Sequence, residues 1–119
     1  MHLDELQVYQ KSVVLSTEVY ARVAMWAIFD RDTLGKQMVR SADSVPLNIA
    51  EGYGRFSGAD NRKFTMYARG SLFELRTQLL LAHQRRLLSD EEFEKFSSGV
   101  QILLAQLIAY SRSIPTTRA

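Results

Sequence analysis

Apolar residues recur at helical spacing along almost the whole chain, and this pattern constrains the fold more than any other feature. Four segments show the period near 3.6 residues that is typical of amphipathic helices, and no segment sustains the alternation of a half-buried strand. Short polar stretches separate the segments, so consecutive helices must be neighbours. The pattern predicts an all-α fold: an antiparallel up-down-up-down four-helix bundle.

The first two helices are expected on either side of a short turn. The first runs from about Asp4 to Ala27, and a turn at residues 29–32 follows, after which Asp32 or Thr33 can cap the second helix. On the second helix one side is apolar and the other carries charged and polar residues. The predicted core stripe of these two helices is Leu6, Tyr9, Val13, Tyr20, Val23, Ala24, Leu34, Met38, Ala42, Val45, Ile49, Gly52 and Phe56.

The third and fourth helices are predicted from capping boxes, in which a serine and an acidic side chain each satisfy a backbone donor at a helix start. Residues 57–60 and 89–92 both have this form. The third helix should end near Arg85 and Arg86, and Pro115 should stop the fourth. The predicted core stripe of these helices is Phe64, Tyr67, Ala68, Ser71, Leu72, Leu75, Leu79, Ala82, Phe93, Phe96, Val100, Leu103, Leu107, Tyr110 and Ile114.

The second helix contains a proline and ends in glycines, which are poor helix formers. We expect Pro46 to kink this helix. Small residues on the second and third helices predict that the two approach each other closely. Polar side chains beside the proline form a hydrogen-bonded cluster or, alternatively, a ligand-binding face. The residues of this structural motif are Pro46, Asn48, Ala50, Glu51, Gly52, Gly54, Ala68 and Gly70.

Length and composition bound the class of protein. A chain of 119 residues with 46% hydrophobic content is enough for one core, so we expect a single domain over residues 1–119. The absence of cysteine excludes disulfides, thiolate zinc sites and a cysteine nucleophile. The N-terminal residues lack the basic and apolar regions of a signal peptide, and no apolar run is long enough to span a membrane. These features predict a cytoplasmic protein.

The third helix carries a second apolar stripe, roughly opposite its core stripe. Met66, Phe73 and Leu80 are spaced by seven and stay aligned along the helix. An exposed stripe of this kind marks association, so we expect a homo-oligomer with these residues near its interface. The first helix has a similar extra stripe, for which a broad buried face is an equally good interpretation. Its residues are Val8, Leu15, Val19 and Trp26.

Basic residues outnumber acidic ones between Thr33 and Leu88, although the net charge of the chain is only +2. Three arginines of the third helix are spaced by seven and form one line beside the second apolar stripe. Such a line can contact nucleic-acid phosphates, but a solvated helix face or ion pairs across a subunit contact explain it at least as well. The candidate nucleic-acid contacts are Arg40, Arg55, Arg62, Lys63, Arg69 and Arg76.

The sequence offers little for catalysis. His2 and His83 have no second histidine or carboxylate at ligand spacing, so no metal site is predicted. The acidic residues at 90–94 lie in a first helical turn, where they complement the helix dipole. A ligand face at Asn48 and Glu51 lacks a nucleophile and a base. We therefore expect no cofactor and no enzymatic activity.

Two motifs give the chain a resemblance to a known family. Val45-Pro46-Leu47-Asn48-Ile49-Ala50-Glu51-Gly52-Tyr53-Gly54-Arg55 and Tyr67-Ala68-Arg69-Gly70-Ser71-Leu72-Phe73-Glu74-Leu75, with Leu6-Gln7-Val8-Tyr9-Gln10-Lys11 at the start, closely resemble the four-helix bundle family of ribosomal RNA intervening-sequence proteins. Residues 55–58 are less basic than the run expected after the glycines.

This resemblance implies a four-helix bundle that assembles as a ring of five subunits. Its members are small bacterial proteins, some encoded within insertions of large-subunit ribosomal RNA genes. Related bundle proteins accompany the reverse transcriptases of diversity-generating retroelements, which implies a possible reverse-transcriptase partner. The resulting hypothesis is a non-enzymatic homo-oligomer, pentameric by resemblance, that binds RNA or DNA through a basic surface. The alternative is a protein-interaction scaffold whose arginines serve subunit contacts.

Overall fold

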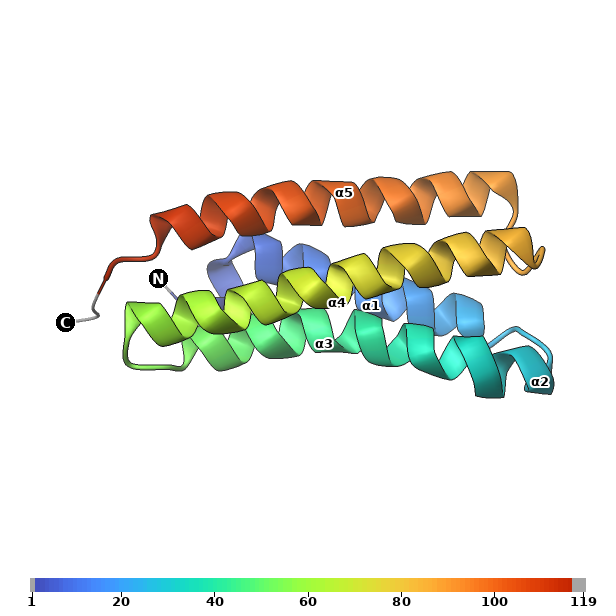
Figure 1. The fold of residues 1–119 in the computed structure, drawn as a ribbon, viewed down its shortest axis with the longest axis horizontal. Coiled ribbons are helices and arrows are strands. Elements are labelled where there is room, and N and C mark those ends of the chain that lie inside the picture. The colour runs from blue at the N-terminus through green and yellow to red at the C-terminus, as the bar shows by residue number, and fades with distance from the viewer. Residues whose placement is uncertain (1, 117–119) are drawn as a thin grey trace.

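Four long helices lie side by side along the long axis of the molecule (Figure 1). The computed structural model describes residues 2–116, within which no strand occurs. The all-α four-helix bundle predicted from the sequence is confirmed. The long helices are α1 (Gln7–Val23), α3 (Lys36–Tyr53), α4 (Gly58–Gln84) and α5 (Asp90–Ser113). A 3-10 turn at Leu3–Glu5 precedes α1, and a short helix α2 (Ile28–Asp30) precedes a π-helical turn at Arg31–Gly35.

Each long helix packs against the helices that precede and follow it in the chain. α3 contacts both α1 and α4, α4 contacts α5, and α5 returns to α1 to close the bundle. The short connections enforce this order, because they leave no length for a crossover. The α3–α4 connection and the end of α5 lie at one end of the molecule (Figure 1), and the α4–α5 connection lies at the other.

The turn between the first two long helices differs from the prediction. α1 ends at Val23, and helical structure resumes at Ile28, where Ala27 is the N-cap residue. Residues 29–32 therefore lie within helical structure that continues through the π-helical turn into α3. Thr33 does not cap a helix: its hydroxyl donates to the carbonyl of Phe29 at 2.7 Å, inside the helical segment. The prediction was wrong because the polar residues at 30–33 face solvent along this segment.

The helix ends predicted for α4 and α5 are confirmed. Ser57 is the N-cap of α4, and its hydroxyl accepts from the Asp60 backbone N–H at 3.1 Å. Ser89 and Glu92 form a complete capping box, with distances of 3.1 Å and 2.9 Å between hydroxyl or carboxylate oxygen and backbone nitrogen. α4 ends at Gln84, just before the two arginines, and α5 ends at Ser113, just before Pro115.

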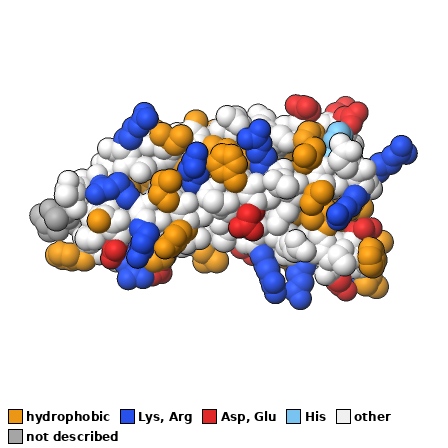
Figure 2. Space-filling model, in the orientation of Figure 1, with side chains coloured by type: hydrophobic (Ala, Val, Ile, Leu, Met, Phe, Trp, Pro, Cys, Tyr) orange, Lys and Arg blue, Asp and Glu red, His pale blue; other side chains and the backbone are white. Residues whose placement is uncertain are grey.

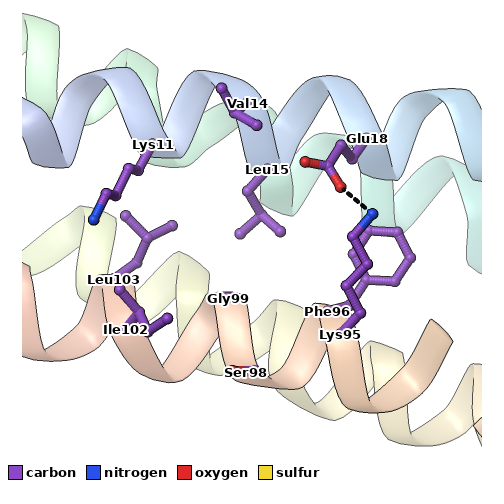
Figure 3. Close-up of a pocket in the computed structure, with 10 residues that line it drawn as sticks. All are labelled: Lys11, Val14, Leu15, Glu18, Lys95, Phe96, Ser98, Gly99, Ile102 and Leu103. Carbon is purple, nitrogen blue, oxygen red and sulfur yellow. Dashed lines mark ion pairs between the residues drawn. The ribbon is translucent and has the colours of Figure 1, made fainter. Parts of the chain in front are cut away.

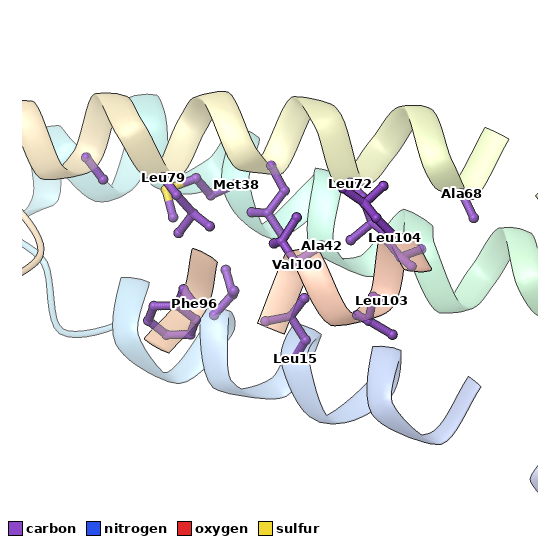
Figure 4. Close-up of a cluster of buried hydrophobic side chains, with 14 of the residues drawn as sticks. Leu15, Met38, Ala42, Ala68, Leu72, Leu79, Phe96, Val100, Leu103 and Leu104 are labelled. Atoms are coloured by element: carbon purple, nitrogen blue, oxygen red, sulfur yellow. The ribbon is translucent and has the colours of Figure 1, made fainter. Parts of the chain in front are cut away.

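The core runs along the bundle axis, and side chains from all four long helices meet in it (Figure 4). The core stripes predicted for the second, third and fourth helices are largely correct. Phe56 and Tyr67 are exceptions, because they are 81% and 52% exposed. The large side chains that are fully buried are Met38, Ile49, Leu72, Leu75, Leu79, Leu103, Leu107, Val19, Val45 and Val100.

The core face predicted for α1 is largely wrong, although Val23 is buried as predicted. Val13 and Tyr20 are exposed, Ala24 lies outside the helix and is exposed, and Leu6 and Tyr9 are only partly buried. The second stripe is buried, as the interpretation of a broad buried face predicted. Its residues Val8, Leu15, Val19 and Trp26 belong to the core. Two adjacent apolar stripes on one helix give similar periodicity, so spacing alone does not show which stripe the other helices cover.

The structural motif around Pro46 divides into residues with different roles. α3 continues through Pro46 to Tyr53. The Asn48 side chain donates to the carbonyl of Ser44 at 2.8 Å, and Glu51 pairs with Arg55 at 2.9 Å. The two contacts share no residue, so they are separate local contacts and not one cluster. These contacts account for both polar residues without a ligand.

The close approach of α3 and α4 depends on Gly52 alone among the three glycines of the motif. A Cβ atom at Gly52 would lie 2.7 Å from the Asn61 side-chain oxygen and 3.0 Å from the Asn61 carbonyl oxygen. At Gly54 the nearest atoms would be 3.5 Å away, and Gly70 is exposed with nothing within 4 Å. The prediction that Gly70 packs between these helices was wrong.

Candidate functional site

The outer face of α4 carries the apolar stripe of Met66, Phe73 and Leu80. These side chains are 50%, 39% and 47% exposed, since they point away from the core stripe of the same helix. Gly70 lies on the same side of α4 and is also exposed. Figure 2 shows hydrophobic side chains interspersed with Lys and Arg on the face that includes α4. We call Met66, Phe73 and Leu80 the outer apolar stripe.

The interface residues predicted on α1 do not belong to a free surface. Val8, Leu15 and Trp26 are all buried in the core of this chain. The indole N–H of Trp26 also donates to the carbonyl of Leu87 at 3.1 Å, which ties the end of α1 to the α4–α5 connection. These three side chains are therefore unavailable to a second subunit, and the predicted interface is reduced to α4.

The three arginines spaced by seven on α4 have different surroundings. Arg62 donates to the carbonyl of Ile114 at 3.0 Å, so it anchors the segment that follows α5. The guanidinium of Arg69 lies 4.9 Å from the centre of the Phe73 ring, in a cation–π contact. Arg76 is exposed. Within residues 2–116, no carboxylate forms an ion pair with any of these three guanidinium groups.

The other predicted phosphate contacts lie elsewhere on the bundle. Arg55 and Lys63 both lie over the ring of Phe64, at 4.8 Å and 5.2 Å from its centre. Arg55 also pairs with Glu51, and Lys63 pairs with Asp60. Arg40 lines a groove between α1 and α3, together with Lys36 and Asp32. The six predicted residues therefore do not form one patch. Among the candidate residues on α4, Arg69 and Arg76 have neither an ion pair nor a contact with another helix within residues 2–116, whereas Lys63 pairs with Asp60.

A groove of about 270 Å³ lies between α4 and α5 beside Arg69. Its lining is mostly apolar and includes two arginines, and we call it the α4–α5 groove. Its residues are Thr65, Met66, Arg69, Leu107, Ile108, Ser111 and Arg112.

Two polar residues of this groove, Ser111 and Arg112, were missed by sequence reasoning. The groove depends on how α4 and α5 pack side by side in antiparallel register, and the periodicity of a single helix does not give that register. A bond of 3.2 Å from the Asn61 side chain to the Tyr110 hydroxyl marks this register. Pairing the C-terminal half of α5 with the N-terminal half of α4 would have placed a second arginine beside the α4 line.

A larger groove of about 330 Å³ lies between α1 and α5 (Figure 3). Val14, Leu15 and Ile102 contribute apolar surface, and the ion pair between Lys95 and Glu18, at 3.0 Å, lies across one end. This arrangement has no nucleophile paired with a base.

His83 has a structural role at the end of α4. Its Nε2 lies 2.7 Å from an Asp90 carboxylate oxygen, and its ring stacks on Phe93 with centres 4.3 Å apart. Within the described residues, no group of three His, Cys, Asp or Glu side chains is placed to hold a metal ion. In the same part of the chain, no helix is both long and apolar enough to cross a membrane.

The Glu92 carboxylate has a pKa below its ordinary value of 4.5. The hydrogen bond from Arg22 is the largest cause, and the backbone N–H of Ser89 adds to it. Arg22 also donates to the carbonyl of Leu87 at 3.2 Å. The lowered pKa therefore reflects a link between α1 and the start of α5, distant from the basic residues of the α4–α5 groove.

A comparison with protein families matches residues 4–109 to the 23S rRNA-intervening sequence proteins. The match covers most of the chain. The chain belongs to the family of 23S rRNA-intervening sequence proteins. The family resemblance seen in the two sequence motifs is thereby confirmed.

A solved structure supports the fold of this intervening-sequence protein. The crystal structure of a protein of unknown function from the S23 ribosomal protein family of Bacteroides thetaiotaomicron VPI-5482 superposes with a TM-score of 0.83. The two sequences are 20% identical, and the match covers 89% of this chain and 96% of the other. At that identity the likeness concerns the fold alone. No curated protein sequence matches the chain.

Proposed function

We propose that this intervening-sequence protein is a cytoplasmic, non-enzymatic homo-oligomer that binds nucleic acid through basic residues on α4. The observation that carries the proposal is the pair Arg69 and Arg76 on the solvent side of α4. Neither guanidinium forms an ion pair within residues 2–116, and both lie beside exposed apolar side chains. Unpaired arginines on one helix surface suit phosphate contacts, which position a nucleic acid without reading its sequence.

Self-association is part of the proposal because the outer apolar stripe has no partner within the chain. Met66, Phe73 and Leu80 leave an apolar face on a helix that is already fully covered on its core side. Exposed apolar faces of this kind are typical of interaction sites. The family resemblance implies a ring of five subunits. Such a ring would present the arginines of α4 five times, so the assembly would bind a long polyanion more strongly than one subunit does.

The alternative is a protein-interaction scaffold, for which the same outer apolar stripe is the supporting observation. In that case Arg69 and Arg76 would pair with acidic residues of a neighbouring subunit or of a protein partner such as a reverse transcriptase. The two functions differ in salt dependence, since contacts with phosphates release counterions from the nucleic acid.

The proposal is tested by binding of a fluorescent structured RNA across a salt series. We expect affinity for the native chain to fall steadily with salt, and the variant with Arg69→Glu and Arg76→Glu to lose binding while it keeps its oligomeric mass. Arg62 is left intact because it anchors the segment after α5.

A matched control reverses two other exposed cations, Lys11→Glu and Arg85→Glu, which lie outside the α4–α5 groove and the arginine line. This control should keep most of the binding. Absence of binding by the native chain at low salt would contradict the proposal and favour the scaffold.

A further inference from the structure

We propose that the α4–α5 groove is a binding site for one nucleotide of a single-stranded nucleic acid. The phosphate is held between Arg69 and Arg112, and the base lies over Met66, Leu107 and Ile108, which we call the apolar floor. This inference rests on the proposed function and narrows it to one site and one class of ligand. It adds two residues, Arg112 and Ser111, that the arginine line on α4 does not include.

The charges of the groove favour an anion. Arg69 comes from α4 and Arg112 from α5, so two arginines line one small cavity. Neither makes an ion pair within the described residues, and no acidic side chain is among the groove's lining. The Ser111 side chain adds a hydroxyl that can donate to a phosphate oxygen. Two arginine forks and a hydroxyl match the acceptor-only surface of a phosphate.

The acidic part of α5 does not neutralise this end of the helix. Asp90, Glu91 and Glu92 occupy the first turn of α5, whereas Arg112 lies in its last turn. At a rise of ~1.5 Å per residue, these groups are about 30 Å apart. That separation exceeds the Debye length of ~8 Å at physiological ionic strength. A strand of nucleic acid would therefore meet a positive potential at the C-terminal end of α5 and a negative one at the other end.

The orientation of Arg69 suits a flat ligand. Its guanidinium lies 4.9 Å from the centre of the Phe73 ring, and this contact restrains the guanidinium. A guanidinium that is fixed in this way offers a planar surface on which a base can stack, in addition to its donors.

The apolar floor favours a single strand over a duplex. Met66 and Ile108 are exposed to solvent, and Leu107 lies beneath them as part of the core. An apolar floor can cover the face of a base only if the base is unpaired and turned outward. A duplex would present phosphates to the two arginines and leave the floor uncovered. The groove volume of about 270 Å³ lies just below the range of typical small-molecule sites, which suits one nucleotide of a longer strand.

The test compares binding of a labelled single-stranded oligonucleotide and of its duplex, as RNA and as DNA, by the full chain and three variants. We expect Arg69→Ala with Arg112→Ala to weaken single-strand binding at least ~10-fold and to reduce the salt slope by about 0.7, the value for one single-strand phosphate contact. The control Lys11→Ala with Arg85→Ala removes the same charge and should weaken binding less than ~3-fold.

A third variant tests the apolar floor separately. Ile108→Ser keeps every charge, and Ile108 is 41% exposed, so the fold should tolerate it. We expect single-strand binding to weaken about 3- to 10-fold and duplex binding to stay the same. The mass of each variant is measured in the same buffer.

Three outcomes would overturn the inference. Equal losses in the arginine variant and its control would place binding elsewhere on the surface, with the proposed function intact. A change of oligomeric mass in the arginine variant would assign the groove to a subunit contact. Absence of binding by the native chain to every probe would overturn both the site and the proposed function.

Discussion

Gly52 lies where the end of α3 meets the start of α4, and its neighbours leave no space for a side chain. We expect Gly52→Ala to destabilise the protein by about 1–3 kcal/mol, the usual cost of overpacking a close contact. The reason is that a Cβ atom would lie 3.0 Å from both the Asn61 carbonyl oxygen and the Phe64 Cβ. Thermal or urea denaturation measures the effect. A variant as stable as the native protein would show that α3 and α4 can separate at little cost.

Gly70 is the matched control, because it lies in α4 with nothing within 4 Å. In an isolated subunit, Gly70→Ala should stabilise the helix by up to about 1 kcal/mol, as an exposed glycine within a helix does when alanine replaces it. A loss of stability or of oligomeric mass would instead show that another subunit packs against Gly70.

Arg86 occupies a backbone conformation that favours glycine. Its φ is 60°, and it lies just after the C-cap of α4, where the Leu87 N–H donates to the carbonyl of Ala82 at 2.8 Å. This is the pattern of a Schellman motif, in which glycine is the preferred residue. Arg86→Gly should therefore raise the free energy of unfolding by about 0.5–1 kcal/mol. Denaturation of Arg86→Ala alongside it is the check, since alanine keeps the strained φ and should bring no gain.

The capping serines and the two glycines show which single-residue features can be predicted from one sequence. The two capping serines were assigned correctly because their hydrogen bonds are local, within three residues. Gly52 and Gly70 looked alike in the sequence, although one is closely packed and the other is open. The difference depends on which side of each helix its neighbour covers, and that information is absent from local spacing.

At the scale of elements, Glu92 joins the start of α5 to α1. Its carboxylate accepts from Arg22 and from the Ser89 backbone N–H, and both bonds lower its pKa. A carboxylate with a lowered pKa in the folded state stabilises the fold above its ordinary pKa of 4.5. That stabilisation is lost as the pH falls through the lowered value, because protonation removes both interactions.

The contribution of this link is measured by comparing the stability of the native chain with that of Glu92→Gln across pH. At pH 7 the variant should be less stable by about 0.5–1 kcal/mol, since glutamine keeps part of the capping box but not the ion pair. The difference should shrink as the pH falls from 5 to 3. Denaturation at several pH values measures it. A constant difference over this range would show that the charge of Glu92 contributes nothing to the link.

The packing of α1 is where element-scale prediction failed. Periodicity identified two apolar stripes on this helix, and the one that was chosen includes the exposed Val13 and Tyr20. The covered stripe contains Val8, Leu15 and Val19. The same ambiguity did not affect α4, where the buried stripe contains five fully buried leucine and alanine side chains in regular succession, and the other stripe is interrupted by Gly70. The fold class followed from the number and length of helices, which neither choice of face changes.

At the scale of the whole molecule, the outer apolar stripe and the α4–α5 groove lie on adjacent sides of α4 and share Met66. A subunit contact centred on Phe73 and Leu80 would leave the groove at the edge of the contact. Each oligomer would then carry several grooves, so that a single strand could occupy more than one of them. Weak binding at each groove would become strong binding by the assembly.

Leu80→Glu tests this arrangement, because it places a charge in the outer apolar stripe without touching the groove. Leu80 is 47% exposed and does not line the groove, so the helix content of the variant should match that of the native chain. Burying an unpaired carboxylate in an apolar contact is costly, and the variant should therefore be a monomer by light scattering. Its affinity for a short oligonucleotide that fills one groove should stay within about 3-fold of the native value, because the groove is intact. Its affinity for a long single strand should fall ~10-fold or more, because the gain from linked sites is lost. An unchanged mass would place the subunit contact away from α4, and equal losses for short and long strands would show that assembly contributes nothing to binding.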